Sequence, residues 1–334
     1  GLGLPVVIGS HLAAAVETLS PARLADMTAL GQPVLALTDR RAETLKARAY
    51  DPGLARIQVP GQADLAWLRA LADPAGDLMT PLKGPLRTLR GGETDDHRAA
   101  LALAKSAQLL PAILMVPAAP LEGLTRLATA PLLAQLAQEA VLAPVVAARV
   151  PLAAAERSRL HVFRPDTGAE EHYAVEIGDP PRDGPVLARL HSACFTGDVL
   201  GSLKCDCGPQ LQAALAAMGQ AGQGVLLYLN QEGRGIGLAN KMRAYALQDQ
   251  GFDTVEANHR LGFEDDERDF RIGAALLRRL GFGAVRLMTN NPRKVAMMQA
   301  QGIAVVERVP LIMPTNRHNS AYLAVKARKS GHLL

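Results

Sequence analysis

Apolar and polar positions in the second half of the chain follow two periods that alternate along the sequence. The apolar run GVLLYL (224–229) follows a glycine and predicts a short buried strand. On either side of it, residues 208–222 and 237–251 have apolar positions at helical spacing, and each stretch ends at a glycine. Another strand is predicted at 284–289, directly before a helix start at NNPRK. This alternation predicts an α/β (α+β) fold with ligand-binding loops at the ends of strands.

The length of 334 residues indicates two domains rather than one. The pattern changes near residue 150: the preceding part is rich in Ala and Leu and contains no cysteine, whereas short clusters of Gly, Pro and charged residues follow. Pro144 and Pro151 bracket a strand-like apolar stretch at the join. We therefore expect one domain over residues 1–148 and a second over 149–334.

Composition and charge disfavour several classes of partner. Aromatic residues make up 4% of the chain, which is little material for stacking bases, and a net charge of +4 is weak for binding DNA or RNA. The same mild positive charge suits a phosphorylated small molecule. No long uncharged apolar run predicts a membrane span. We expect a small-molecule ligand, no nucleic acid and no membrane partner.

The three cysteines of the chain, Cys194, Cys205 and Cys207, lie within fourteen residues of one another. An odd, clustered set is a poor disulfide framework and indicates a reducing cytoplasm. Thiolates are good zinc ligands, and a fourth ligand would be either His191 or water. Water in that place is the arrangement of a catalytic zinc ion. The alternative is three buried, reduced cysteines without a metal.

These residues also carry a resemblance to a known family. The stretch RLHSACFTGDVLGSLKCDCGPQL (189–211) resembles the zinc signature of GTP cyclohydrolase II, an enzyme of riboflavin biosynthesis. The resemblance extends over nearly all of residues 150–334 through five further stretches, in order along the chain: YLNQEGRGIGLANKMRAYALQDQG (228–251), DTVEANHRLGFEDDERDF (253–270), RLMTNNPRKV (286–295), ERVPL (307–311) and KSGHLL (329–334).

The resemblance implies a reaction and its cofactors. GTP would lose C8 of its guanine ring as formate and its two outer phosphates as pyrophosphate, leaving a 2,5-diamino-6-(5-phosphoribosylamino)pyrimidinone. One Zn²⁺ per chain on the three cysteines would supply hydroxide, and Mg²⁺ would accompany the GTP phosphates. The family also implies a homodimer.

Site residues carry over by position. The resemblance implies a catalytic role for Asp266 as proton acceptor, for Arg268 at the α-phosphate and for Tyr245 near the guanine. Arg268 would be either a nucleophile or a phosphate clamp; a guanidinium is almost always protonated, which favours the clamp. The substrate-binding residues implied are Arg189, Gln210, Glu232, Gly233, Arg234, Thr254, Thr289 and Lys294. Gln210 would read the guanine edge.

Two departures from the family pattern keep alternatives open. Ala193 stands where the common form has Glu, and Asn230 stands where many members carry a basic residue. We expect weaker or altered GTP binding at most. The alternatives are a relative that stops at the formamidopyrimidine or takes another nucleotide, and a non-catalytic module that binds zinc and GTP or RNA.

The first half resembles, more faintly, a 3,4-dihydroxy-2-butanone 4-phosphate synthase domain, over residues 31–46 and 95–116. The acids expected in the earlier stretch are reduced to Asp39 and Glu43. In the later stretch His97 lacks its acidic partner, and we expect it to be a surface histidine at a helix start. The sequence thus predicts a degenerate, non-catalytic domain that serves dimerisation, stabilisation or binding of a regulator.

Overall fold

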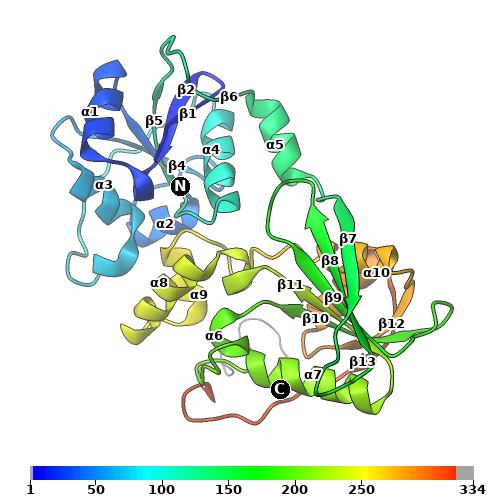
Figure 1. Ribbon diagram of the computed structural model, residues 1–334. Helices are drawn as coiled ribbons and strands as arrows, with labels where there is room; N and C mark the ends of the chain where they lie inside the picture. Colours follow the sequence, from blue (N-terminus) through cyan, green and yellow to red (C-terminus); the bar gives the residue numbers. More distant parts are fainter. Residues whose placement is uncertain (1–2, 321–334) are drawn as a thin grey trace. The chain divides into compact units, whose positions relative to one another are not determined.

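A computed structural model describes residues 3–320 and shows an α/β protein made of two compact units (Figure 1). The first unit comprises Gly1–Gln138 and Ile236–Glu267, and the second comprises Glu139–Gly235 and Arg268–Leu334. Each unit contains one sheet with helices, so the fold class expected from the sequence is confirmed. Among the described residues, no helix combines the length and the apolar character needed to cross a bilayer.

The first unit contains a six-stranded sheet in the order β4-β3-β5-β2-β1-β6. Only the β1–β6 pair is parallel; the other pairs are antiparallel. Its strands are β1 (Val6–Ile8), β2 (His11–Ala15), β3 (Val34–Leu37), β4 (Ala55–Gln58), β5 (Ala112–Pro117) and β6 (Arg126–Leu127). Its helices before residue 138 are η1 (Val16–Thr18), α1 (Pro21–Leu30), α2 (Asp39–Thr44), α3 (Leu65–Ala72), η2 (Pro74–Gly76), α4 (Asp95–Ser106) and α5 (Thr129–Ala137).

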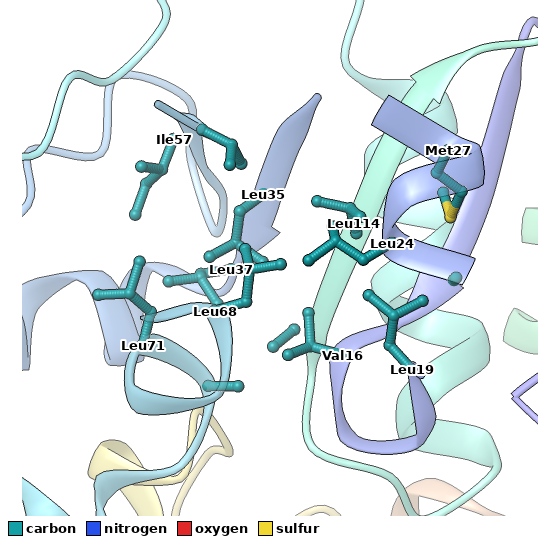
Figure 2. Packing of buried hydrophobic residues seen from close by; sticks show 14 of the residues in the cluster. Val16, Leu19, Leu24, Met27, Leu35, Leu37, Ile57, Leu68, Leu71 and Leu114 are labelled. Atoms are coloured by element: carbon teal, nitrogen blue, oxygen red, sulfur yellow. The ribbon is translucent and has the colours of Figure 1, made fainter. Parts of the chain in front are cut away.

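The central strands of this sheet are buried on both faces. Leu35 and Leu37 of β3 point into one apolar cluster with Leu114 of β5 and residues of α1 and α3 (Figure 2). Ala36, between Leu35 and Leu37, and Ile113, next to Leu114, belong to a second apolar cluster on the opposite face of the sheet. That cluster also contains residues of α4. Because successive side chains of a strand point to opposite faces, the continuous apolar runs of β3 and β5 require cover on both sides.

Two helices from the second half of the sequence complete the first unit. They are α8 (Leu238–Asp249), which confirms the helix expected over 237–251, and α9 (Thr254–Arg260). The α9 helix begins with a capping box, in which Asp253 accepts from the N–H of Glu256 and the Glu256 side chain accepts from the N–H of Asp253. Helix α8 contacts η2, and α9 contacts α2.

The second unit contains a seven-stranded sheet in the order β13-β12-β10-β11-β9-β8-β7. Strands β13, β12, β10 and β11 run parallel, and β9, β8 and β7 continue the sheet by antiparallel pairing. The strands are β7 (Leu142–Arg149), β8 (Ser158–Pro165), β9 (His172–Ile177), β10 (Val186–Ser192), β11 (Gly224–Leu229), β12 (Ala284–Met288) and β13 (Ala304–Val309). The helices are α6 (Phe195–Asp198), α7 (Cys207–Gln220), η3 (Glu232–Gly235), α10 (Arg271–Arg279) and α11 (Pro292–Ala300).

Strands β11 and β12 and helices α7 and α11 lie where the apolar periodicity predicts them. The stretch expected to join two domains is itself a strand, because β7 pairs with β8 at the edge of the second sheet. The two compact units divide between residues 138 and 139, and the expected boundary between 148 and 149 falls within β7. The division of function at that boundary stays a prediction.

The expectation that His97 is a surface histidine is wrong. His97 lies on α4, is 4% exposed and has its ring centroid 4.9 Å from that of His11. Burial lowers the pKa of His97 to about 4. The error arose because the apolar side of α4, which faces the sheet, begins in the first helical turn, so a polar residue there is covered.

Candidate active site

The carboxyl ends of three neighbouring parallel strands, β12, β10 and β11, lie at the same edge of the second sheet. Cys194 follows β10 by two residues, Glu232 follows β11 by three, and Thr289 comes directly after β12. Loops at this edge of a parallel sheet are where α/β proteins bind ligands. The sheet order therefore brings together three stretches that are up to 95 residues apart in sequence.

The three thiols converge beside this edge. The Sγ atoms of Cys194, Cys205 and Cys207 all lie within 4.8 Å of one another, and those of Cys194 and Cys205 are 3.7 Å apart. Cys194 and Cys205 are buried, and Cys207 is half-buried at the start of α7. A hydrogen bond with the Cys194 thiol raises the pKa of Cys205. Thiolates this close repel one another unless a cation lies among them, so the donor set fits a thiophilic divalent ion.

Two glycines allow α6 and α7 to meet at the thiols. A Cβ atom on Gly197 would lie 2.8 Å from the Cys205 Sγ and 3.1 Å from the Cys194 Sγ. A Cβ on Gly208 would lie 2.3 Å from the carbonyl oxygen of Gly197. Neither position has room for a side chain, so both glycines are needed for the thiols to converge.

Asp198 connects the first cysteine to its surroundings. Its carboxylate accepts hydrogen bonds from the backbone N–H of Cys194 at 3.0 Å and from the hydroxyl of Tyr228 at 2.9 Å. Burial, followed by the charge of Asp198, raises the pKa of Tyr228, so its hydroxyl remains a donor. The Nε2 atom of His191 lies 3.0 Å from the same carboxylate, and the His191 ring stacks on Tyr228.

Of the two fourth ligands considered from the sequence, His191 lies outside the group of converging side chains, and water stays a prediction. Among the described residues, the thiols are the only group of potential metal ligands that converge, and His191 is not among them. Its Nε2 atom is directed at Asp198. Catalytic zinc sites typically have three protein ligands, and water or substrate occupies the fourth coordination position.

The glycine-rich loop after β11 reaches the first cysteine loop through Glu232. The Glu232 carboxylate accepts hydrogen bonds from the backbone N–H of Phe195, next to Cys194, and from that of Gly233. Gly233 and Arg234 both have φ near +63°, so the loop turns sharply here. Arg234 is a rare non-glycine residue in this left-handed region, and such strain is common at functional sites.

Arg189 and Gln210 lie together behind the cysteine loop. The Arg189 guanidinium donates to the Gln210 side-chain oxygen at 2.5 Å and to the Met288 carbonyl oxygen at 3.0 Å. The Gln210 amide nitrogen in turn donates to Asp206, the residue between Cys205 and Cys207. Burial lowers the pKa of Arg189 to about 10. With its amide oxygen and nitrogen both bonded here, Gln210 orders the cysteine loop; its reading of a guanine edge stays a prediction.

Two cations lie close to the ring of Phe270 near the end of β10. The Arg268 guanidinium lies 4.7 Å from the ring centroid and donates to the Ser192 hydroxyl, and the Lys294 Nζ lies 5.3 Å from the centroid and donates to the Leu190 carbonyl. Cations gathered at a strand end and at the first turn of α11 favour an anion such as phosphate.

The turn that leads into α11 is ordered by its own side chains. The Thr289 hydroxyl, which is buried, accepts from the N–H of Asn291, and the Asn291 side chain accepts from the N–H of Arg293 and caps the helix. These bonds hold Thr289 and Lys294 in one short turn.

Three of the expected site residues belong to the first compact unit. Tyr245 is half-buried on α8 with the Lys241 Nζ 5.7 Å from its ring, and the Thr254 hydroxyl at the start of α9 accepts from Gln248. Asp266 is exposed in the loop that follows α9. The remaining eleven expected site residues lie in the second unit.

Residues outside the expected set of site residues also shape the site. Asp198 and Tyr228 support the first cysteine, and the Phe270 ring contacts both cations. Asp198 lies within the cysteine motif itself, so its position was a usable signal. At the two departures, Ala193 and Asn230, the backbone N–H is bonded. That of Ala193 donates to the Leu229 carbonyl oxygen, and that of Asn230 donates to the Nδ1 atom of the His172 ring. The closing stretch KSGHLL lies outside the described residues.

Comparison with known proteins gives consistent relatives. The family model described as GTP cyclohydrolase II matches residues 143–310. A GTP cyclohydrolase-2 from Azospirillum brasilense is 47% identical over 326 residues, which cover 93% of this chain and 83% of that protein. A GTP cyclohydrolase-2 from Azotobacter vinelandii is 58% identical over 175 residues, which cover 52% of this chain and 84% of that protein. The riboflavin biosynthesis protein RibBA from Bacillus cereus is 59% identical over 165 residues, 49% of this chain and 42% of RibBA.

Proposed function

The chain belongs to the GTP cyclohydrolase II family, and on this basis we propose that it hydrolyses GTP to 2,5-diamino-6-(5-phosphoribosylamino)pyrimidin-4(3H)-one, formate and pyrophosphate, the first step of riboflavin biosynthesis. The observation that carries the proposal is the convergence of three thiols beside the carboxyl ends of parallel strands, without a fourth protein ligand among the described residues.

Cys194, Cys205 and Cys207 would hold one Zn²⁺. When bound in a three-ligand site, zinc lowers the pKa of a coordinated water and so provides hydroxide near neutral pH. Asp198 holds the backbone of Cys194, and Gln210 holds Asp206 between the other two cysteines. These outer contacts orient the thiols before a ligand arrives.

The cations around Phe270 would bind the phosphates of Mg²⁺-bound GTP. Lys294 is held at the first turn of α11 and supplies a point charge. Arg268 presents a planar guanidinium to the same Phe270 ring. We assign Arg268 as a clamp that stabilises charge at the α-phosphate, because a guanidinium does not lose its proton readily enough to act as a nucleophile. The other substrate contacts proposed at this edge of the second sheet are those of Thr289, Glu232, Gly233 and Arg234.

In the first unit, the segment Ile236–Glu267 carries the other proposed contacts with the substrate. Asp266 would accept a proton, Tyr245 would lie near the guanine, and Thr254 would bind the ligand. We further propose that residues 1–148 are not catalytic themselves, that the protein acts as a homodimer and that it works in the cytoplasm. A reducing compartment keeps three thiols available for a metal.

Turnover with product identification tests the function. Purified protein is incubated with GTP and Mg²⁺, with and without a zinc chelator, and mass spectrometry follows the pyrimidine, formate and pyrophosphate. We expect all three products, and their loss with the chelator. Opening of the ring without release of formate would instead support the altered-product relative, and zinc content with GTP binding but no turnover would support the binding module.

A further inference from the structure

The segment Ile236–Glu267 lies within the residues that match the GTP cyclohydrolase II family, yet it forms one compact unit with Gly1–Gln138. This segment, called the 236–267 segment below, contains α8, α9 and the loop that follows them. It carries three of the proposed functional residues: Tyr245, Thr254 and Asp266. The contacts within the first unit therefore determine the positions of these three residues.

An apolar cluster joins the segment to the first part of the chain. Leu110, which precedes β5, is 2% exposed and packs among six buried residues of the segment. These residues are Ile236, Ala244, Leu247, Ala257, Leu261 and Phe263. The N–H of Leu110 donates to the Glu17 carboxylate, and the same carboxylate pairs with Arg243 of α8 at 2.8 Å. The core of the segment is thus completed by Leu110.

At two glycines of the segment, the backbone approaches side chains of the first part of the chain closely. A Cβ on Gly237 would lie within 2.9 Å of three atoms of Gln108, and one on Gly262 would lie 2.9 Å from both Pro111 and Thr38. Both glycines have positive φ, near +85° and +88°. The buried Thr38 hydroxyl donates to the Gly262 carbonyl at 2.9 Å, which fixes the chain just before the Asp266 loop.

Two ion pairs hold the loop around Asp266. The Arg40 guanidinium makes three hydrogen bonds of 2.8 to 3.2 Å to Glu264, and the Lys105 Nζ lies 2.6 Å from Glu267. Glu267 also accepts from the backbone N–H of Glu264 at 2.9 Å. Asp266 lies between these two anchored glutamates in the sequence, so both ends of its short loop are fixed.

The Arg40–Glu264 pair is 38% and 47% exposed, and ion pairs at such exposure add little to global stability. The Lys105–Glu267 pair is less exposed, at 26% and 22%. An ion pair that contributes little to stability can still affect the reaction rate through the position of the loop. Displacing a reacting group by about 1 Å can lower the rate about 100-fold.

We propose that the first part of the chain is the scaffold of the 236–267 segment, and that Arg40 and Lys105 are positioning residues that hold the loop of Asp266 for the hydrolysis of GTP. This inference rests on the proposed function. It gives a positioning role to the first part of the chain, which we predict to be non-catalytic.

The test compares the full-length protein with the double variant Arg40→Gln/Lys105→Met. We expect kcat to fall about tenfold or more while the KM for GTP changes less than about twofold, because the cations proposed to bind phosphate are untouched. Zinc content and melting temperature should remain those of the unmodified protein. Arg286→Gln is the matched control, because it removes an exposed ion pair, with Glu307, that does not involve the segment.

Charge reversal separates positioning from a general effect of substitution. Arg40→Glu and Glu264→Arg should each lower kcat, and the two together should restore most of it. Hydrogen exchange of residues 263–267 should be faster in the Arg40→Gln/Lys105→Met variant than in the unmodified protein.

Two results would overturn the inference: a kcat within about twofold of the unmodified enzyme in the double variant, or unchanged hydrogen exchange in this loop. If the unmodified protein does not turn over GTP, the proposed function fails, and the exchange measurement still decides whether the two cations hold the loop.

Discussion

The carboxylate of Asp198 accepts a hydrogen bond from the backbone N–H of Cys194, 3.0 Å away, and thereby fixes the first residue of the thiol cluster. The same carboxylate is held by Tyr228 and lies against His191. Support of this kind sets the direction in which a metal ligand points before the metal arrives.

Replacement of Asp198 should therefore weaken metal binding without removing a ligand. We expect Asp198→Ala to lower zinc affinity about 10- to 100-fold, because Cys194 loses the acceptor that orders its backbone. Competition with a chromophoric chelator measures the affinity. Glu307→Gln, which alters an exposed carboxylate paired with Arg286, is the control. Equal zinc affinity in the Asp198 variant and the unmodified protein would contradict the supporting role.

A methyl group at Gly197 should displace the thiols. The added Cβ would lie 2.8 Å from the Cys205 Sγ, closer than such atoms approach in proteins. We expect Gly197→Ala to contain well below one zinc per chain and to lose activity about tenfold or more. Gly184→Ala is the matched control, because nothing lies within 4 Å of a Cβ at that position. Full zinc content in Gly197→Ala would show that the cysteine loop can relax around the methyl group.

Asp77 should be important for the stability of the first unit. It is 6% exposed and accepts from Arg41 and Lys83, with Arg260 of α9 at 3.3 Å. Burial by itself raises the pKa of Asp77, but the bonds from Arg41 and Lys83 outweigh it, so the pKa is lowered.

Asp77→Asn would leave the fully buried Arg41 without its counter-charge, and we expect it to cost about 3–5 kcal/mol of unfolding free energy. Urea unfolding followed by the fluorescence of Trp67, the one tryptophan of the chain, reports on this unit. Asp26→Asn, an exposed position on α1, should change the midpoint little. A loss below about 1 kcal/mol would mean that the first unit accommodates the buried cation.

The first unit should lose stability in mild acid through His97. Burial is the largest cause that lowers the pKa of His97 to about 4, with His11 and Arg56 adding to it and Asp96 and Asp51 opposing it. The unfolded chain takes up the proton near pH 6.5, whereas the folded unit does not until about pH 4. Unfolding free energy should therefore fall as the pH falls through this window, by about 2 kcal/mol between pH 7 and pH 5.

Trp67 fluorescence in urea at several pH values measures this dependence, and His97→Gln should flatten it. Asp96 takes up its proton at lower pH. Burial raises the pKa of Asp96, but hydrogen bonds from Thr129, His11 and Ser10 outweigh burial and lower the pKa to about 2. Its effect on the unfolding free energy therefore comes below about pH 4. The same slope in His97→Gln and the unmodified protein would assign the loss to another group.

The sequence predicted those features whose causes lie within a few residues. Strand β11 and helix α11 follow from apolar period, glycine and proline signals that act locally. The thiol cluster could be proposed because its three members lie within a fourteen-residue stretch, so a single turn and the start of α7 suffice to bring them together.

The tertiary structure alone decided which partners distant residues acquire. The sequence predicts helix α8 but not that it packs on Leu110, and it shows Arg40 and Arg41 without indicating that one holds Glu264 and the other Asp77. The burial of His97 has the same cause. Periodicity specifies which side of an element is apolar, whereas burial and pairing depend on which surface from elsewhere in the chain covers that side, and this is a property of the whole packed unit.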